Sequence, residues 1–281
     1  MKREALYRRS AFSDRPGGGN PAGVWIGEAL PAADVMQRIA AEVGYSETAF
    51  VAPAQGRIRT IRYYSPEMEV PFCGHATIAT GVVLGETEGD GQYRLMTSVG
   101  EVTVEVQSKA GMREAALTSV EPRQAAIDDQ VLNDVLAALG WGAADLDGAV
   151  PAIKAYAGAW HLVLAVRQRS RLDELQYDFE GLKAIMTSEN LTTLQLVWRE
   201  NDRLFHARNP FPVGGIVEDP ATGAAAAALG GYLRDAGLID VPASILILQG
   251  EAMGRPSRLT VEIPTAGGIV VRGTAVPIEA P

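Results

Sequence analysis

The chain has 281 residues, enough to bury a large core in one large domain or two of moderate size. Its net charge of −9, from 25 basic and 34 acidic residues, argues against nucleic acid as the main partner. No stretch approaches the roughly 18 uninterrupted apolar residues of a membrane helix, so we expect a soluble, cytoplasmic protein with no membrane partner. Cys73 is the only cysteine, which excludes a disulfide within the chain and a cysteine-based metal cluster.

The first half of the chain mixes short strands with isolated helices. Helical spacing of apolar residues predicts a helix over 32–43. A second helix is expected over 75–84, ended by Gly85. Strict alternation over 101–106 predicts a strand with one buried face, and a further strand over 112–119 closes this half.

The second half follows a similar plan. It opens with a predicted helix over 129–139, with Asp128 as its N-cap, and contains another over 223–235. Because strands outnumber helices and are often joined by short turns, we predict an α+β fold with largely antiparallel sheets, not a doubly wound nucleotide fold. The strands expected in this half cover 153–156, 161–166, 194–198, 203–208, 245–248, 259–263 and 269–276.

Two segments of the chain, 71–77 and 218–224, resemble each other, and in each a glycine begins a run of small residues. The similarity of the two segments predicts two similar lobes, one over 1–119 and one over 120–281. The last strand of the chain can return to the N-terminal lobe. Two helix N-termini, with unpaired N–H groups, could then hold one small carboxylate. When residues whose numbers differ by 149 are compared, the identical pairs are Glu69 and Glu218, Pro71 and Pro220, Gly74 and Gly223, Ala76 and Ala225, and Leu84 and Leu233.

Three polar residues, one after the first predicted helix and two in these segments, have both a chemical and a structural interpretation. Glu47 enters an apolar run, where partial desolvation would suit a general acid/base, but it can equally be a solvent-facing strand residue. His75 either contacts a ligand or only caps a helix. Asp219 either caps a helix or accepts a hydrogen bond from a substrate amine or hydroxyl.

The sequence does not support several other kinds of functional site. The glycine-rich segment 17–23 has the spacing of a dinucleotide fingerprint, but Pro21 and the strand that follows stand where that fingerprint needs a helix. Neither a P-loop nor a serine-hydrolase motif is present. His161 and His206 are expected to be ordinary half-buried strand residues, and the three histidines predict no metal site.

Four motifs, in order along the chain, resemble those of the PhzF-like (phenazine biosynthesis) proteins, which are relatives of diaminopimelate epimerase. The resemblance covers nearly the whole chain. It implies two lobes, each a curled and mostly antiparallel sheet around a central helix, with the active site in the cleft between them. The motifs lie at 12–24, 46–51, 71–77 and 218–223.

The resemblance also implies a function. Members of this family look like cofactor-independent isomerases that move a proton on a small carboxylate-bearing substrate, and they are often homodimers. Carried over by position, Glu47 would be the proton-shuttling acid/base, while His75 and Asp219 would bind and polarise the substrate. Gly74 and Gly223 would present backbone N–H groups to its carboxylate, and no metal, nucleotide or pyridoxal cofactor would be needed.

The chain departs from the family at one position and differs from a mechanistic rival at another. Ala224 stands where the family usually has a serine, which puts the namesake substrate, a dihydro-hydroxyanthranilate, in doubt. Two-thiol racemases need a second cysteine, but Thr222 lies opposite Cys73, which is expected to pack beside its helix rather than react. The alternatives are a small-carboxylate binding protein without catalysis and a structural or regulatory partner protein.

Overall fold

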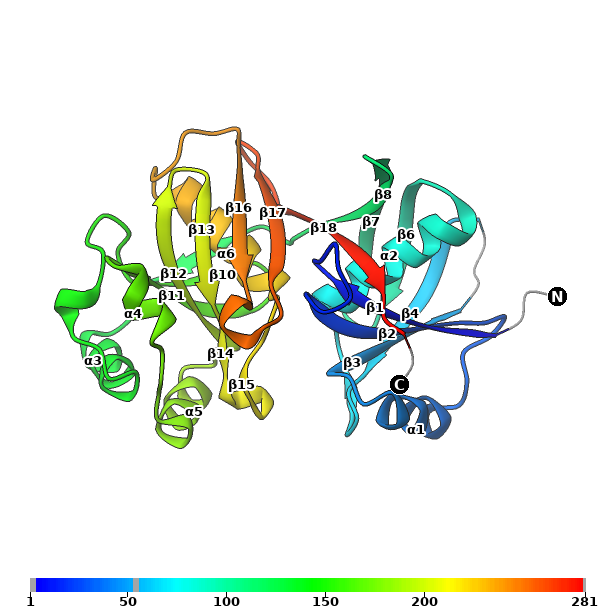
Figure 1. The fold of residues 1–281 in the computed structure, drawn as a ribbon, viewed down its shortest axis with the longest axis horizontal. Coiled ribbons are helices and arrows are strands. Elements are labelled where there is room, and N and C mark those ends of the chain that lie inside the picture. Colours follow the sequence, from blue (N-terminus) through cyan, green and yellow to red (C-terminus); the bar gives the residue numbers. More distant parts are fainter. Residues whose placement is uncertain (1–3, 53–55, 280–281) are drawn as a thin grey trace. The chain divides into compact units, whose positions relative to one another are not determined.

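The computed structural model describes residues 4–52 and 56–279, and the chain divides into two compact units. The first unit contains Met1–Thr118 and Arg272–Pro281, and the second is Ser119–Val271 (Figure 1). The expected mixture of many strands with few helices is confirmed. Of the helices in the described ranges, none is long and apolar enough to cross a membrane.

The strands of the first unit form a closed barrel. Their order is β1, β2, β3, β4, β6, β7, β8, β18, and β18 also pairs with β1, so the sheet closes on itself. The strands are β1 Ala5–Ala11, β2 Asn20–Ile26, β3 Glu47–Ala52, β4 Ile58–Tyr64, β5 Glu69–Val70, β6 Gly91–Thr97, β7 Gly100–Lys109, β8 Met112–Thr118 and β18 Val270–Pro277, with the helices α1 Ala33–Val43 and α2 Gly74–Glu88.

Helix α2 is longer than the sequence predicts. It runs through Gly85 and ends at Gly89, whose φ is +97°. A Cβ on Gly85 would stand 2.5 Å from a methyl group of Val106, so this glycine permits close packing of β7 instead of ending the helix. Every residue of α2 from 75 to 85 is buried, against β8, β2 and β7 above all.

The strands of the second unit lie in the order β9, β10, β11, β12, β13, β16, β17. Most of the predicted elements of this half are confirmed, including α6 with the predicted bounds. The strands are β9 Arg123–Ala125, β10 Ile153–Tyr156, β11 Trp160–Val166, β12 Thr193–Asn201, β13 Leu204–Arg208, β14 Pro210–Phe211, β15 Ile216–Glu218, β16 Ala243–Gln249 and β17 Ser257–Ile263, with the helices α3 Asp129–Ala138, α4 Arg169–Asp173, α5 Phe179–Ser188 and α6 Gly223–Asp235.

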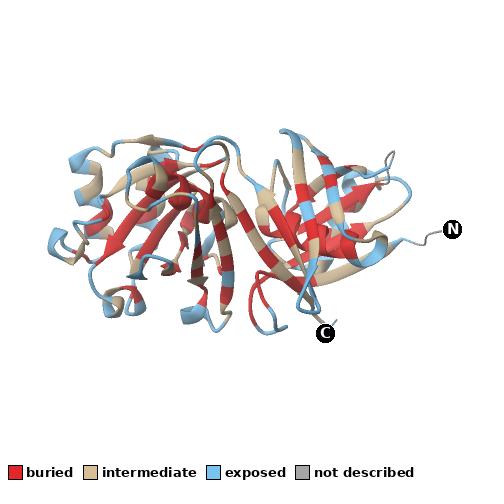
Figure 2. Ribbon diagram, turned by 90° about the horizontal axis from the view of Figure 1, so that it is seen from above, coloured by how far each residue is buried: buried red, intermediate tan, exposed pale blue. Residues whose placement is uncertain are grey.

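Two kinds of helix pack on the sheet of this unit. The alanine-rich α6 is buried over 225–233 and packs on β10, β17, β11 and β12, so its small side chains allow close packing on the sheet. Helices α3 and α5 share a separate apolar cluster with β11 and β12 that includes Leu162 and Leu194. The sequence interpretation missed α5, although Asp178 caps it through a hydrogen bond from the Gly181 N–H. Figure 2 shows red, buried residues concentrated on the strands of each unit, whereas α1, α3 and α5 mix exposed, intermediate and buried residues.

The two units repeat one pattern of strand pairing. In the first, β2–β3 and β4–β6 are parallel pairs whose connections contain α1 and α2. In the second, β11–β12 and β13–β16 are parallel pairs whose connections contain α5 and α6. The sheets are therefore mixed, but most of the strand pairs in the described residues are antiparallel, as expected, and the parallel pairs are those joined by helical crossovers.

A similar ion pair in each unit explains why Glu69 and Glu218 are identical in the two similar segments. Glu69 accepts hydrogen bonds from Arg62 of β4, one of them 2.7 Å long. Glu218 accepts from Arg208 of β13 at 2.6 Å. In both units the pair ties the segment before the glycine-led helix to the strand that precedes it, in a bidentate arrangement that fixes geometry well.

Candidate functional site

In the first unit, Glu47, Cys73 and His75 converge at the start of α2. Glu47 is the first residue of β3, while Cys73 is the N-cap residue of α2 and His75 lies in its first turn. Glu47 Oε2 lies 3.3 Å from His75 Nε2, and Cys73 Sγ lies 3.5 Å from Glu47 Oε2. Cys73 Sγ is also 3.3 Å from His75 Nδ1. A carboxylate, a thiol and an imidazole thus form one contact group.

The polar neighbours of His75 assign its ring nitrogens. Asn20 Nδ2 lies 3.2 Å from Nδ1, and because an amide NH₂ can only donate, Nδ1 is the acceptor. In the neutral ring the proton then sits on Nε2, which faces Glu47 and Ser46 Oγ, each at 3.3 Å. His75 can therefore act as a hydrogen-bond donor beside the Glu47 carboxylate.

The backbone at the start of α2 is held from inside the unit. Thr77 Oγ1 donates to the Cys73 carbonyl at 2.6 Å, and the Tyr63 hydroxyl lies 2.6 Å from Thr77 Oγ1. Burial raises the pKa of Tyr63, so its phenol stays protonated and remains a donor. These contacts fix the positions of Cys73 and Gly74.

Gly74 faces open space. A Cβ built on it would have no atom within 4 Å, and its φ does not require glycine. Neither packing nor backbone strain within the structure therefore explains the glycine. A ligand that approaches the helix N-terminus closely would need this space.

In the second unit, the residues Asp219 and Thr222 are held together before α6. The Thr222 hydroxyl donates to Asp219 Oδ2 at 2.5 Å, and the Asp219 N–H donates to the Asn209 carbonyl at 3.0 Å. Thr222, not Asp219, is the N-cap residue of α6, and its side chain forms no capping hydrogen bond. Gly223 is the first residue of this helix, as Gly74 is of α2.

Gln249 holds the segment from Asp219 to Thr222 in place through hydrogen bonds. It is fully buried, and its Nε2 donates to the Asp219 carbonyl at 2.7 Å and to Thr222 Oγ1 at 3.1 Å. Its Oε1 accepts from the Thr222 N–H at 3.2 Å. One amide therefore fixes both ends of the turn that carries Asp219.

Of the predicted site residues, Glu47, Gly74 and His75 lie together in the first unit, and Asp219 and Gly223 lie together in the second. Sequence reasoning missed the contacts made by Asn20, Cys73 and Gln249. Asn20 and Cys73 lie within the motifs at 12–24 and 71–77, whereas Gln249 lies in none of the four motifs. Cys73 was expected to pack only, yet its sulfur contacts both other polar groups.

The other two histidines are more buried than predicted. His161 is fully buried, with Nδ1 2.8 Å from Thr193 Oγ1, and burial lowers its pKa to about 3. His206 is 5% exposed and lies between Glu251, 2.9 Å from Nδ1, and Glu200, 2.8 Å from Nε2. Both positions are structural.

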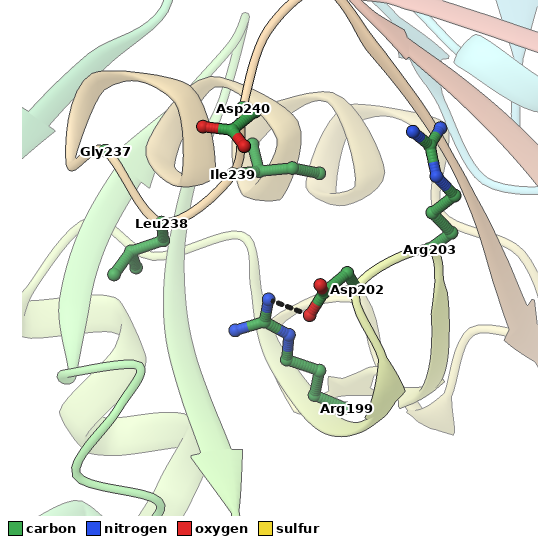
Figure 3. A pocket seen from close by; sticks show the side chains of 7 residues that line it. All are labelled: Arg199, Asp202, Arg203, Gly237, Leu238, Ile239 and Asp240. Carbon is green, nitrogen blue, oxygen red and sulfur yellow. Dashed lines mark hydrogen bonds and ion pairs between the residues drawn. The ribbon is translucent and has the colours of Figure 1, made fainter.

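A pocket of about 230 Å³ in the second unit lies away from these residues (Figure 3). It is lined by Arg199, Asp202, Arg203 and residues 237–240, and Arg199 donates to Asp202 at 2.7 Å. Arg203 extends apart from that pair in Figure 3. None of the predicted site residues lines this pocket.

The chain is similar to known isomerases and to solved structures of one fold. It is 32% identical to an uncharacterized isomerase of Deinococcus radiodurans, over 95% of this chain and 87% of the relative. It is also 32% identical to the trans-2,3-dihydro-3-hydroxyanthranilate isomerase of Pseudomonas chlororaphis, over 88% and 86%. A PhzF-family phenazine biosynthesis protein of Bacillus anthracis has the same fold, with a TM-score of 0.87, 23% identity and coverage of 99% and 98%.

The family described as phenazine biosynthesis-like protein, PhzC-PhzF, matches residues 9–280. This match covers nearly the whole chain and includes every residue of the contacts described above. Relatives in the family are named isomerases and epimerases. The chain therefore belongs to the PhzC-PhzF family of phenazine biosynthesis-like proteins.

Proposed function

We propose that the protein is a cofactor-independent isomerase that moves a proton on a small carboxylate-bearing substrate, with Glu47 as general acid/base. The observation that carries the proposal is the 3.3 Å contact of Glu47 with His75 at the start of α2, where a Cβ on Gly74 would meet no atom within 4 Å. Glu47 is partly exposed, with 20% of its side chain accessible. A carboxylate held in this way can both meet a substrate and exchange a proton with it.

His75 and Asp219 bind and polarise the substrate in this proposal, and the Gly74 and Gly223 N–H groups bind its carboxylate. Donors aimed at the carboxylate draw electron density from the neighbouring carbon, which makes its C–H more acidic. Glu47 removes that proton and returns it at another position. One base is enough when the proton returns to the same face of the substrate.

For the substrate, we propose only a chemical class. The relative from Pseudomonas chlororaphis is named for trans-2,3-dihydro-3-hydroxyanthranilate. At Ala224 this chain lacks the hydroxyl that the family usually has. Since a site rejects analogues mainly through unpaired polar groups, we propose a related small acid with one polar contact fewer.

We also carry forward the organisation inferred from the sequence. We propose two similar lobes, 1–119 and 120–281, with the last strand returning to the N-terminal lobe, and each lobe is a curled sheet around a central helix. Two observations support this division. Helices α2 and α6 are both buried, and the chain passes from the first compact unit to the second between Thr118 and Ser119. A cytoplasmic location and a homodimer belong to the same proposal, and sedimentation equilibrium tests the dimer.

A second candidate function is a small-carboxylate binding protein that has lost catalysis, favoured by Ala224. One experiment separates the two. The purified protein is incubated with small amino, hydroxy and unsaturated acids in deuterated water, and each acid is examined by mass spectrometry. Enzyme-dependent deuterium gain supports the isomerase. A ligand that binds tightly but gains no deuterium supports the binding protein.

A further inference from the structure

The two carboxylate oxygens of Glu47 have different surroundings. Oε2 lies 3.3 Å from His75 Nε2 and 3.5 Å from Cys73 Sγ. Within the described parts of the chain, no hydrogen-bond donor contacts Oε1, and Oε1 is not one of the unpartnered side-chain atoms that are fully buried. The first unit therefore holds one oxygen of this carboxylate and leaves the other accessible.

The Cys73 thiol donates to Glu47 and not to His75. Its sulfur lies 3.3 Å from His75 Nδ1 and 3.8 Å from Nε2, so it stands over the face of the imidazole ring. The Nδ1 lone pair lies in the ring plane and accepts from Asn20 Nδ2 at 3.2 Å. A thiol has a single hydrogen to donate, and a carboxylate is the stronger acceptor. The S–H group therefore points to Glu47 Oε2.

We propose that Glu47 exchanges the substrate proton through Oε1, and that Cys73 is a positioning residue that holds Oε2 together with His75. Oε1 takes the proton from a substrate C–H, whose electron pair stays on the substrate, and the same oxygen returns the proton. Oε2 keeps both of its donors throughout. Because two donors on one oxygen fix the plane of the carboxylate, Oε1 is held in one direction.

The thiol also affects how readily Glu47 ionises. A hydrogen bond donated to a carboxylate favours its charged form, so loss of the thiol should make Glu47 hold its proton up to a higher pH. Cys73 and His75 are the titratable side chains that pair with Glu47 within the described residues. The proton transfer through Oε1 rests on the proposed function, whereas the contact between Cys73 and Glu47 does not.

The contact is tested first, on the full chain and without substrate. Cys73 is the only cysteine, so the S–H stretching band of the infrared spectrum reports on this thiol alone. Glu47→Gln replaces the charged acceptor with a neutral one, and we expect the band to move to higher wavenumber because the hydrogen bond is weaker. Glu42→Gln, on the exposed face of α1, is the matched control and should leave the band in place. An unmoved band in folded Glu47→Gln overturns the contact.

The role of the thiol is tested with Cys73→Ala, on an acid that gains deuterium in the presence of the wild-type enzyme. We expect kcat to fall about tenfold with KM changed by less than about twofold, because the reacting group is misplaced while substrate binding is kept. The acid limb of the pH profile of kcat/KM should move up by about half a pH unit. Ser244→Ala, at an exposed position of β16, should match the wild type in all three values.

The direction of the change in turnover decides which oxygen reacts. If Oε2 were the reacting oxygen, removal of the thiol would free it and leave a stronger base, so kcat would rise or stay the same. Either result in Cys73→Ala, with its fold verified by circular dichroism, overturns the proposal. If the S–H band responds to Glu47→Gln but no acid exchanges deuterium with the wild-type chain, the contact stands and the isomerase proposal fails.

Discussion

Glu47 Oε2 and His75 Nε2 lie 3.3 Å apart, although two strands, β4 and β5, separate their elements along the chain. The contact exists because β3 begins and α2 begins at the same end of the barrel of the first unit. It brings an acid and a hydrogen-bond donor to the start of α2, the helix that Gly74 begins.

Asn20 should control which nitrogen of His75 carries the proton. Asn20→Asp replaces the donor to Nδ1 with a carboxylate, so Nδ1 takes up a proton; the resulting imidazolium pairs with the Glu47 carboxylate and makes it a weaker base. We expect kcat to fall on the order of 100-fold, within the range of general acid/base effects. The measurement is steady-state turnover on the identified acid. Asn133→Asp, on the exposed face of α3, is the control, and equal turnover of the two variants would refute the tautomer assignment.

Gly74→Ala should separate stability from function. The added methyl group meets no atom within 4 Å, so the free energy of unfolding should change by less than about 0.5 kcal/mol. It would fill the space that a ligand needs, so substrate affinity should fall.

Gly81→Ala in the same helix is the contrasting variant, because its Cβ would lie 2.9 Å from the Cβ of Ala115 and 2.7 Å from Val104. We expect it to destabilise the fold by about 1–3 kcal/mol. Urea unfolding and ligand titration measure both variants. Unchanged substrate affinity in Gly74→Ala would show that the open space is not part of the site.

Gln249→Leu should loosen the turn that carries Asp219. The change leaves the Thr222 N–H and the Asp219 carbonyl without their buried partner, at about 1–3 kcal/mol for each unsatisfied group. We expect a lower urea midpoint and a higher KM on the identified acid. Gln92→Leu, at an exposed position of β6, is the control. If Gln249→Leu matched that control in both measurements, Gln249 would not position Asp219.

His161 should make the protein less stable in acid. Burial lowers its pKa to about 3 in the folded chain, whereas an unfolded histidine has a pKa near about 6.5. Between these values the unfolded chain binds a proton that the folded chain does not. Stability therefore falls as the pH falls below about 6.5, by up to about 1.4 kcal/mol per pH unit.

The variant His161→Gln does not titrate, so its stability should depend less on pH. Urea unfolding of both proteins at about pH 7 and about pH 4.5 gives the two differences. A smaller loss in the variant is the expected result. Equal losses would mean that His161 is protonated in the folded state or does not contribute.

Local patterns predicted much of the fold. Helix α6 and the Asp128 cap of α3 could be read from sequence because capping and small-residue runs act over a few residues. Gly85 was misread since a glycine that permits packing and one that ends a helix look alike until the neighbouring strand is known. Helix α5 was missed, and with it the parallel pairing of β11 and β12.

The candidate site was predictable only in part. Motif positions indicated Glu47, His75 and Asp219, but no local pattern shows that Cys73 Sγ lies 3.5 Å from Glu47 or that Gln249 holds Asp219. Such contacts depend on strand register and on which side chains share one end of a barrel. They appear only when the sheet is assembled.

The central claim is that Glu47 moves the proton, and Glu47→Gln tests it most directly. The variant keeps the size and one oxygen of the side chain but cannot take up a proton at neutral pH. With an acid that gains deuterium in the presence of the wild-type enzyme, we expect exchange by Glu47→Gln to fall by about 10²–10⁴-fold. Glu42→Gln, on the exposed face of α1, should exchange at the wild-type rate. Full exchange by folded Glu47→Gln would contradict the account.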